Sequence, residues 1–274
     1  MTESGFIEVN GGQLYYEAEG SGHPLVLVHA GVANLRQWDE QVPAFAERYR
    51  VIRYDTRGWG RSETDQVEFS NHDDLAAVLD QLGERSAYVL GLSRGGSIVL
   101  NFALAYPDRA DALIFCAGGI EGFEVADTAE EEATWEEAQR HEEAHDWGWV
   151  ADFETRFWVD GPGQSADRVD PDIRDRVHDW ILTTYQEEKN EGMPQRLSPP
   201  ANSRLAELRL PTLVMVGDLD ERTTQLACHH LADTVAGARF EGFHGAAHML
   251  NLEQPEKFTR LVLEFLAESA PPGS

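Results

Sequence analysis

Residues 87–96 read AYVLGLSRGG, and this stretch decides the fold that the sequence predicts. It opens with an apolar run typical of a buried strand and closes with glycines that lead into a segment of helical periodicity. Between them lies the pattern Gly-x-Ser-x-Gly, centred on Ser93. A serine in such a strand–turn–helix connection presents its hydroxyl at a helix N-terminus, and the glycines leave room for a strained backbone. An ordinary glycine-rich connection is the alternative.

The alternation of strand and helix extends along the chain on both sides of Ser93. Residues 6–9 and 14–18, joined through Asn10-Gly11, predict a hairpin. Further strands are predicted at residues 24–29, 49–55, 87–91, 112–116, 212–217 and 238–242, and helices at residues 73–82, 98–106, 223–235 and 255–267. This order favours an α/β fold with a mostly parallel sheet covered by helices on both faces.

Residues 120–204 interrupt this alternation. They carry five of the seven tryptophans and a strong excess of acidic side chains. We find only helical patterns there, such as residues 172–185, and no strand. The sequence therefore predicts a core made of residues 1–119 and 205–274, with a helical insertion at 120–204 between two strands. Residues 270–274 are expected to form a loose tail.

The composition limits the classes of partner. The 49 acidic and 22 basic residues give a net charge of −27. Nucleic acids and anionic membrane surfaces bind clustered Lys and Arg, so we expect neither as a partner. No apolar run is long enough for a membrane span, and the N-terminus lacks the pattern of a signal peptide. We expect a cytoplasmic protein, monomeric or homodimeric, in which Cys116 and Cys228 are buried.

A serine nucleophile needs a base, and the base needs an acid to orient it. Residues 242–248 follow the last predicted strand and contain His244 and His248. We favour His248, with His244 as the competitor. Asp218 and Asp220 follow the preceding strand, and we favour Asp220 because it lies beyond the strand end. The order Ser, Asp, His is typical of one hydrolase arrangement.

These residues resemble the α/β-hydrolase superfamily, in its capped branch of esterases and lactonases. The resemblance rests on the elbow at Ser93, the acid and base candidates, residues 29–31 (HAG) and residues 55–62 (DTRGWGRS). It covers residues 6–120 and 205–268, and it implies that residues 120–204 form a cap. The second segment is similar to the D-x-R-G-x-G-x-S pattern of the superfamily, in which we expect Arg57 to have a structural role.

The resemblance also implies an oxyanion hole made of two backbone N–H groups. One belongs to Arg94, directly after the nucleophile. The other comes from the loop after His29, where the superfamily usually has His-Gly-x and this chain has Ala30. Gly31 is the expected donor, with Val32 as the alternative. No cofactor and no metal are expected in such a site.

The resemblance further predicts the reaction class. Serine at the elbow argues against dehalogenases and epoxide hydrolases of this fold, which carry aspartate there. We predict a carboxylesterase-like serine hydrolase acting on neutral, small to medium or aromatic esters, because the acidic insertion disfavours anionic substrates. An enol-lactonase, a C–C bond hydrolase, a perhydrolase and a non-catalytic small-molecule binder of the same fold remain alternatives. The aromatic residues of 120–204 could line the substrate pocket or pack against one another.

Residues 141–145 match H-E-x-x-H, a zinc-protease helix pattern. On a helix, His141 and His145 would share one face, as two zinc ligands must. The surrounding stretch is rich in glutamate, and no third histidine stands at residue 151. We therefore expect a solvated acidic helix here. No glycine-rich nucleotide-binding pattern occurs in the chain.

Overall fold

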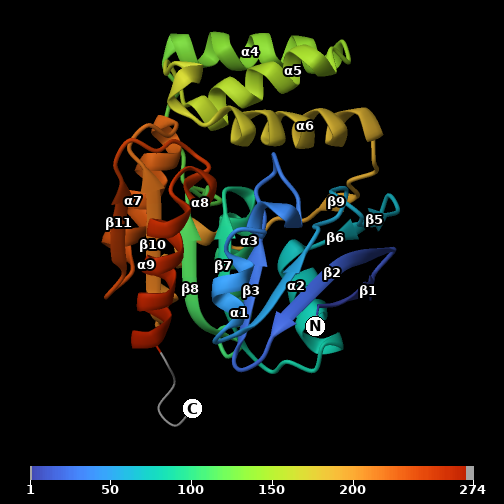
Figure 1. The fold of residues 1–274 in the computed structure, drawn as a ribbon, viewed down its shortest axis with the longest axis vertical. Coiled ribbons are helices and arrows are strands. Elements are labelled where there is room, and N and C mark those ends of the chain that lie inside the picture. Colours follow the sequence, from blue (N-terminus) through green and yellow to red (C-terminus); the bar gives the residue numbers. More distant parts are fainter. Residues whose placement is uncertain (1, 270–274) are drawn as a thin grey trace.

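The computed structural model describes residues 2–269, and its centre is a mixed sheet in the spatial order β1-β2-β4-β3-β7-β8-β10-β11, with β5 paired to β2 (Figure 1). The strands are β1 (Glu3–Val9), β2 (Gly12–Gly20), β3 (Pro24–Val28), β4 (Arg50–Tyr54), β5 (Glu63–Thr64), β7 (Ala87–Leu92), β8 (Ala110–Cys116), β10 (Thr212–Gly217) and β11 (Arg239–Phe243). The pairs from β4 to β11 are parallel. Every strand predicted from the sequence is present.

Helices cover both faces of this sheet because successive strand residues point to opposite sides. On β3, Val26 and Val28 pack in one apolar cluster, whereas Leu25 and Leu27 pack in the other. Helices α2 (Asn71–Gln81), α3 (Arg94–Ala105) and α7 (Arg222–Thr234) contribute to the first cluster. Helices α1 (Val42–Ala46), α8 (Leu250–Glu253) and α9 (Pro255–Glu268) contribute to the second. The predicted doubly covered α/β sheet is confirmed, and Cys116 and Cys228 are buried in it.

The N-terminal hairpin forms as predicted. β1 and β2 pair antiparallel from Glu3 opposite Ala18 to Val9 opposite Gly12. Gly11 adopts a φ of 66° at the turn, a conformation that glycine adopts without the clash of a Cβ. The hairpin is joined antiparallel to β4, so it extends the parallel sheet at one edge.

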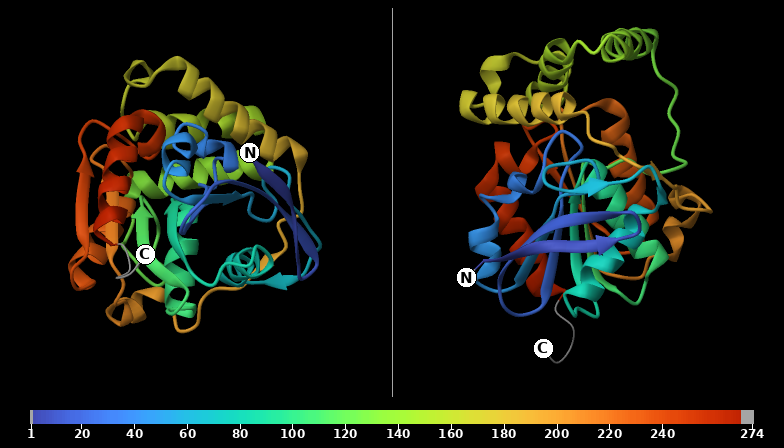
Figure 2. Two further views of the ribbon diagram at one scale, coloured as in Figure 1. Left: turned by 60° about the horizontal axis from the view of Figure 1, so that its bottom comes forward. Right: turned by 90° about the vertical axis from the view of Figure 1, so that its right-hand side faces the viewer.

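A helical layer lies beyond one end of the strands of this sheet, at the top of Figure 1 and again at the top of the right-hand view of Figure 2. We use the name "helical layer" for residues 129–187. The layer consists of α4 (Ala129–Glu143), α5 (Trp147–Glu154), the π-helix η2 (Thr155–Asp160), the short η3 (Ala166–Arg168) and α6 (Pro171–Glu187). The capping box of Thr128 and Glu131 starts α4, and Pro171 opens α6.

One prediction for residues 120–204 is wrong, because the segment contains a strand. β9 (Met193–Pro194) pairs parallel with β6 (Glu68–Phe69) in a small separate sheet. The strand is too short for a sequence pattern, and pairing with residues far away in the chain creates it. The following segment also joins the core, because Leu197 and Ala201 pack in the first apolar cluster. Ala201 begins η4 (Ala201–Glu207).

Two further expectations concern the ends and the surface of the chain. In the part of the chain that the structure describes, no helix is both long and apolar enough to cross a membrane. Residues 270–274, predicted as a loose tail, lie outside the described residues. Two short helices near the site, η1 (Leu35–Trp38) and α1, are not predicted from the sequence.

Candidate active site

Ser93 occupies the sharp turn between β7 and α3. Its backbone has φ 58° and ψ −120°, which is uncommon for a residue with a Cβ. The Ser93 N–H donates to the carbonyl oxygen of Cys116 at 2.8 Å, so neighbouring β8 holds the strained residue in place. The expected strand–turn–helix geometry is therefore present, with Ser93 directly preceding the first turn of α3.

The two glycines of the motif are required by close backbone contacts. A Cβ on Gly91 would lie 2.0 Å from the carbonyl oxygen of Gly95. A Cβ on Gly95 would lie 2.1 Å from the carbonyl oxygen of Val28 on β3. Neither approach leaves room for a side chain, because backbone atoms cannot move aside as flexible side chains do. The spacing of the motif thus follows from packing α3 tightly against β3 and β7.

His248 and Asp220 form a buried pair beyond the carboxyl ends of the parallel strands, where Ser93 also lies. Asp220 follows β10 and His248 follows β11, which are parallel neighbours, so both residues leave the sheet at one end. His248 Nδ1 lies 2.9 Å from each carboxylate oxygen of Asp220. Because a carboxylate only accepts, Nδ1 carries the proton and Nε2 is left as an acceptor.

The helical layer encloses this pair. The ring of Trp158 lies 4.5 Å from the ring of His248, and the backbone N–H of His248 donates to the backbone carbonyl oxygen of Trp158 at 3.3 Å. The Glu221 N–H donates to Asp220 Oδ1 at 2.7 Å and helps to orient the carboxylate. The side chains of His248 and Asp220 are only 3% and 1% exposed.

Asp218 and His244, the alternative candidates for acid and base, form a second pair at the protein surface. His244 Nδ1 lies 2.6 Å from Asp218 Oδ2, and the Gly245 N–H donates to Asp218 Oδ1 at 2.7 Å. The His244 side chain is 98% exposed. Partial burial disfavours the charged form of Asp218, but the hydrogen bonds from His244 and Gly245 outweigh it and lower the pKa of the carboxyl. This pair has the geometry of a surface turn.

A cavity of about 640 Å³ lies between the sheet edge and the helical layer. Ser93 and His248 both line it, as do Gly31, Val32 and Arg94. The opposite wall comes from the helical layer and the segment after it, including Trp147, Glu154, Trp158, Tyr185 and Lys189. Within residues 2–269, Ser93 Oγ and His248 share the cavity without a direct hydrogen bond. Such bonds are often long in unliganded enzymes.

The loop after β3 brings its N–H groups to this cavity. A Cβ on Gly31 would lie 3.7 Å from Cδ of Arg94, so the loop and the start of α3 are in contact. The Gly31 carbonyl oxygen accepts from Trp59 Nε1 at 2.6 Å, while the Ala30 N–H is bound by Gln37 Oε1 at 2.9 Å. The N–H groups of Gly31 and Val32 make no hydrogen bond to any other described residue. Both remain candidate oxyanion donors beside the N–H of Arg94.

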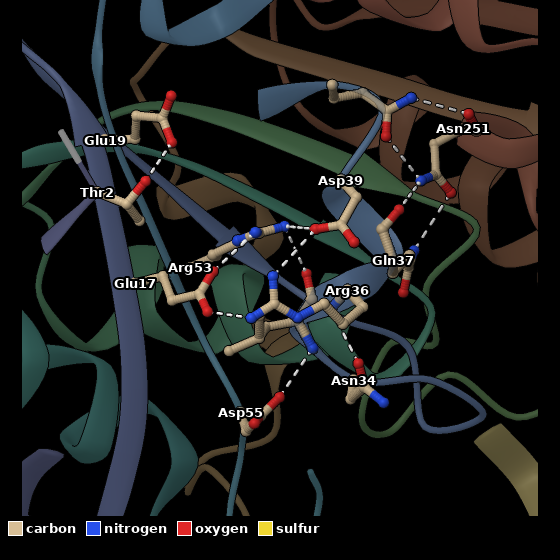
Figure 3. Close-up of polar contacts among 12 residues, drawn as sticks. Thr2, Glu17, Glu19, Asn34, Arg36, Gln37, Asp39, Arg53, Asp55 and Asn251 are labelled. Carbon is tan, nitrogen blue, oxygen red and sulfur yellow. Dashed lines mark hydrogen bonds and ion pairs between the residues drawn. The ribbon is translucent and has the colours of Figure 1, made fainter. Parts of the chain in front are cut away.

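A buried amide network supports this loop and was not predicted from the sequence (Figure 3). Asn251 Nδ2 donates to the Gln37 carbonyl oxygen at 2.9 Å and to Gln41 Oε1 at 3.0 Å. Gln41 Nε2 donates back to the Asn251 carbonyl oxygen at 2.9 Å. Because Asn251 follows His248 by three residues, the network ties the Gly31 loop to the segment that carries His248. No local pattern in the sequence identifies amides that meet across more than 200 residues.

The segment 55–62 has the structural role expected of it. Asp55 accepts N–H groups of Leu35 and Arg61, both at 2.8 Å, and so joins the loops after β3 and β4. Burial raises the pKa of Asp55 to about 6, although these two N–H groups partly offset it. A Cβ on Gly60 would lie 2.2 Å from the Asp55 carboxylate, which explains the glycine.

Arg57 and His29 complete this support beneath the cavity. Arg57 is buried and binds Asp74 through two parallel contacts of 2.7 and 2.8 Å. The Thr56 N–H donates to His29 Nε2 at 3.0 Å, and burial lowers the pKa of His29 to about 3. His29 is therefore a neutral link between two loops.

The aromatic residues of the helical layer divide between the two predicted roles. Trp147, Trp158 and Tyr185 line the cavity. Trp135, Trp149, Phe153 and Phe157 pack against one another: the ring of Trp135 lies 4.8 Å from that of Phe157, and the ring of Trp149 lies 5.2 Å from that of Phe153.

The H-E-x-x-H stretch lacks the geometry of a zinc helix. α4 ends at Glu143, and His145 has a φ of 55° beyond that end, so the shared helix face that two zinc ligands would need does not form. His141 stacks on Trp149 and His145 contacts Glu188 at 3.2 Å. Among residues 2–269, no group of three His, Cys, Asp or Glu side chains could hold a metal ion. α4 itself has no buried residue, as expected for a solvated acidic helix.

A strained serine and a buried Asp–His pair, both held where parallel strands end, define a protein with the α/β-hydrolase fold. The family described as alpha/beta hydrolase fold matches residues 23–153 of the chain. The chain has the α/β-hydrolase fold, as the sequence predicts, and the proteins similar to it include hydrolytic enzymes.

Individual relatives are similar over nearly the whole chain. A 2-hydroxy-6-oxononadienedioate/2-hydroxy-6-oxononatrienedioate hydrolase of Burkholderia vietnamiensis is 27% identical over 93% of this chain and 91% of that protein. A thermophilic esterase from Thermogutta terrifontis, solved with malate bound, is 25% identical with a TM-score of 0.79, covering 98% of this chain and 100% of that one. An enol-lactonase from Burkholderia xenovorans LB400 shares the fold at 24% identity, with a TM-score of 0.77 over 96% of this chain and 100% of that one.

Proposed function

We propose that this protein is a serine hydrolase that cleaves carboxylic esters through an acyl-enzyme intermediate. The observation that carries the proposal is the buried Asp220–His248 pair, whose histidine lines the same cavity as the strained Ser93. A binding protein of this fold would have no need for a base held by a buried acid beside such a serine. The hydrolase relatives support the reaction class.

In the proposed reaction, Ser93 Oγ attacks the acyl carbonyl carbon while its proton passes to His248 Nε2. Asp220 holds the imidazole and stabilises its positive charge. The N–H groups of Arg94 and of Gly31, or Val32 in its place, bind the oxyanion. The C–O bond then breaks, and His248 gives its proton to the leaving alcohol. Water repeats these steps to release the acid and restore Ser93.

We further propose that residues 120–204 act as a cap over a core of residues 1–119 and 205–274. The helical layer supplies one wall of the cavity, so its side chains select the substrate. Trp147, Trp158 and Tyr185 offer apolar surface suited to small or medium acyl groups or an aromatic ring. The partner implied is a small-molecule ester or lactone.

A second candidate is a C–C bond hydrolase or enol-lactonase using the same residues. The dienedioate hydrolase similar over 93% of the chain favours it, since its named substrate is a dicarboxylate rather than a simple ester. Both candidates use Ser93, His248 and Asp220. They differ in the group that leaves and in the charge of the substrate.

The test is hydrolysis of p-nitrophenyl esters from acetate to dodecanoate by the wild type, Ser93→Ala and Ser97→Ala. Ser97 lies one turn further along α3, where its hydroxyl donates to the Gly119 carbonyl oxygen at 2.8 Å. We expect Ser93→Ala to lose at least ~10³-fold in kcat while remaining folded, and Ser97→Ala to retain activity.

The other outcomes separate the candidates. Full activity in Ser93→Ala would contradict the proposed nucleophile. If no ester is cleaved but a fluorophosphonate labels Ser93, the lactonase or C–C hydrolase is favoured. If neither hydrolysis nor labelling occurs, the protein is a binder of this fold.

A further inference from the structure

The Arg94 side chain is a cation at the floor of the cavity, beside Ser93. Its guanidinium lies 3.9 Å from the ring centroid of Trp59, and Nη1 donates to the Thr56 hydroxyl. Both of these partners are neutral. A guanidinium has five N–H donors, and Arg94 is accessible only in part, through the cavity. Most of its hydrogen-bonding capacity is therefore unused by the protein.

Within residues 2–269, no carboxylate lies within ion-pair distance of Arg94. Other interior cations are different. Arg57 binds Asp74 at 2.7 Å, and Arg53 binds Glu17 at 2.8 Å. Lys189, the other basic residue lining the cavity, binds Glu187 at 2.9 Å. Arg94 is thus a cavity cation that no anion contacts among the described residues.

Such a placement costs free energy, because burial removes water from a charge that no carboxylate contacts directly. Burial lowers the pKa of Arg94 to about 10, while more distant Glu191 acts in the opposite direction. At neutral pH the guanidinium is still charged. An anion that enters the cavity would recover this cost through charge-assisted hydrogen bonds, and a carboxylate matches the fork of a guanidinium.

We propose that the Arg94 guanidinium binds a carboxylate carried by the substrate, so that the preferred substrates are monoesters or lactones of dicarboxylic acids. This inference rests on the proposed function and names its substrate class. It replaces the expectation of neutral substrates, which the acidic composition favours. Glu142, Glu154, Glu188 and Glu191 also line the cavity, so the Lys and Arg side chains that a substrate carboxylate meets there are those of Arg94 and Lys189.

The experiment compares matched pairs of methyl esters by titration of the released acid. Monomethyl succinate, glutarate and adipate carry a carboxylate, and methyl butanoate, pentanoate and hexanoate are neutral esters of equal chain length. The measured quantity is the ratio of kcat/KM for the anionic ester to that for its neutral partner. We expect Arg94→Met to lower this ratio at least tenfold for the best pair, through KM more than kcat. Arg94→Lys, which keeps the charge without the fork, should lie between.

Arg61→Met is the matched control, because it removes one guanidinium stacked 3.8 Å from the Tyr15 ring and outside the cavity lining. Its ratio should stay within twofold of the wild type. If Arg94→Met lowers both esters of a pair equally, or neither, the proposal is wrong and Arg94 only supports Trp59 and Thr56. Arg94→Gln, which retains a donor for Thr56, replaces Arg94→Met if that variant does not fold.

A binding measurement keeps the test independent of catalysis. Titration calorimetry of Ser93→Ala should show monomethyl glutarate binding at least tenfold more tightly than methyl pentanoate. The added Arg94→Met change should remove that preference. If no ester is hydrolysed but this preference is present and Arg94-dependent, the proposed function fails and the carboxylate site stands. Equal affinities in both proteins would overturn the site itself.

Discussion

Two Asp–His pairs leave the same edge of the sheet only a few residues apart, and only one of them belongs to the cavity. Asp218 and Asp220 both follow β10, and His244 and His248 both follow β11. We call Asp218 and His244 the outer pair, and Asp220 and His248 the inner pair. The distance from the histidine Nδ1 to the carboxylate is 2.6 Å in the outer pair and 2.9 Å in the inner pair. Contact distance alone would therefore favour the outer pair.

The surroundings of the two histidines separate them. His248 packs under Trp158 of the helical layer and lines the cavity with Ser93, whereas His244 has 98% of its side chain exposed. An ion pair in water is worth little, because solvent screens the charges. A buried carboxylate that holds one imidazole tautomer beside a nucleophile can instead do chemistry. Burial by a distant segment is what distinguishes the two pairs.

The largest expected effect comes from exchanging the histidines for alanine one at a time. His248→Ala should lower kcat for the best p-nitrophenyl ester by on the order of 10⁴–10⁶, because the proposed nucleophile Ser93 would lose its proposed base. His244→Ala should change kcat less than about twofold, since its ring faces solvent. Steady-state kinetics measures kcat of both variants, and circular dichroism checks that both are folded. Equal losses in the two variants would mean that the inner pair has no special role.

The acids should differ in the same way. Asp220→Asn is expected to lower kcat by on the order of 10⁴, because the amide favours the wrong imidazole tautomer. Asp218→Asn should leave kcat unchanged and lower the free energy of unfolding by less than about 1 kcal/mol, as for other exposed pairs. Kinetics and urea unfolding of both variants measure these effects. A greater loss of kcat in Asp218→Asn would show that the acid has been assigned wrongly.

Disrupting the amide network should have a smaller effect on kcat, because the network supports the segment that carries His248 of the inner pair. Asn251→Ala removes the partners of two buried glutamines, which should cost about 2 kcal/mol in unfolding free energy. It should also lower kcat about tenfold, since the Gly31 loop and the His248 segment are no longer joined. Gln254→Ala, which removes an exposed bond to the His244 carbonyl oxygen, is the control. Equal kcat in Asn251→Ala and Gln254→Ala would refute the coupling.

The last expected effect concerns the pH dependence of stability and leaves kcat aside. Burial raises the pKa of Glu154 to about 7, and Glu142 adds to the shift, although the Tyr185 hydroxyl, 2.7 Å from Glu154 Oε1, partly offsets it. The folded state thus holds this proton more tightly than the unfolded chain does. The contribution favours folding at low pH and is lost as pH rises from about 4.5 through about 7.

Denaturant unfolding at pH 5 and pH 8 tests this sign. Relative to Glu154→Gln, the wild type should lose on the order of 1–3 kcal/mol between these values. Asp152→Asn, an exposed change on the same helix, should follow the wild type. A wild type that gains stability with rising pH relative to Glu154→Gln would contradict the direction.

Much of the fold was predictable because its signals are local. The apolar runs that became β3, β7 and β10 are short and bounded by glycines or prolines, and the elbow at Ser93 is a contiguous motif. The acid and base could be narrowed to Asp218 or Asp220 and His244 or His248. The sequence preferred the inner residues only from their position after the strands, and it contained no signal of burial.

What the sequence could not predict depends on contacts between distant segments. β9 exists only because residues 193–194 meet β6, and Asn251 acts only through Gln37 and Gln41. Arg94 could equally have been a surface residue at a helix start. Its position against Trp59 and Thr56, without a carboxylate, results from how the loops after β4 and β7 pack together.

The most direct test of the Ser93–His248–Asp220 assignment is the rate at which a fluorophosphonate labels the protein, followed by intact mass and peptide mapping. This rate needs no knowledge of the natural substrate. We predict a single adduct on Ser93, formed at the wild-type rate in His244→Ala and at least ~10³-fold more slowly in His248→Ala. An adduct elsewhere, or equal labelling rates in the two histidine variants, would contradict the assignment.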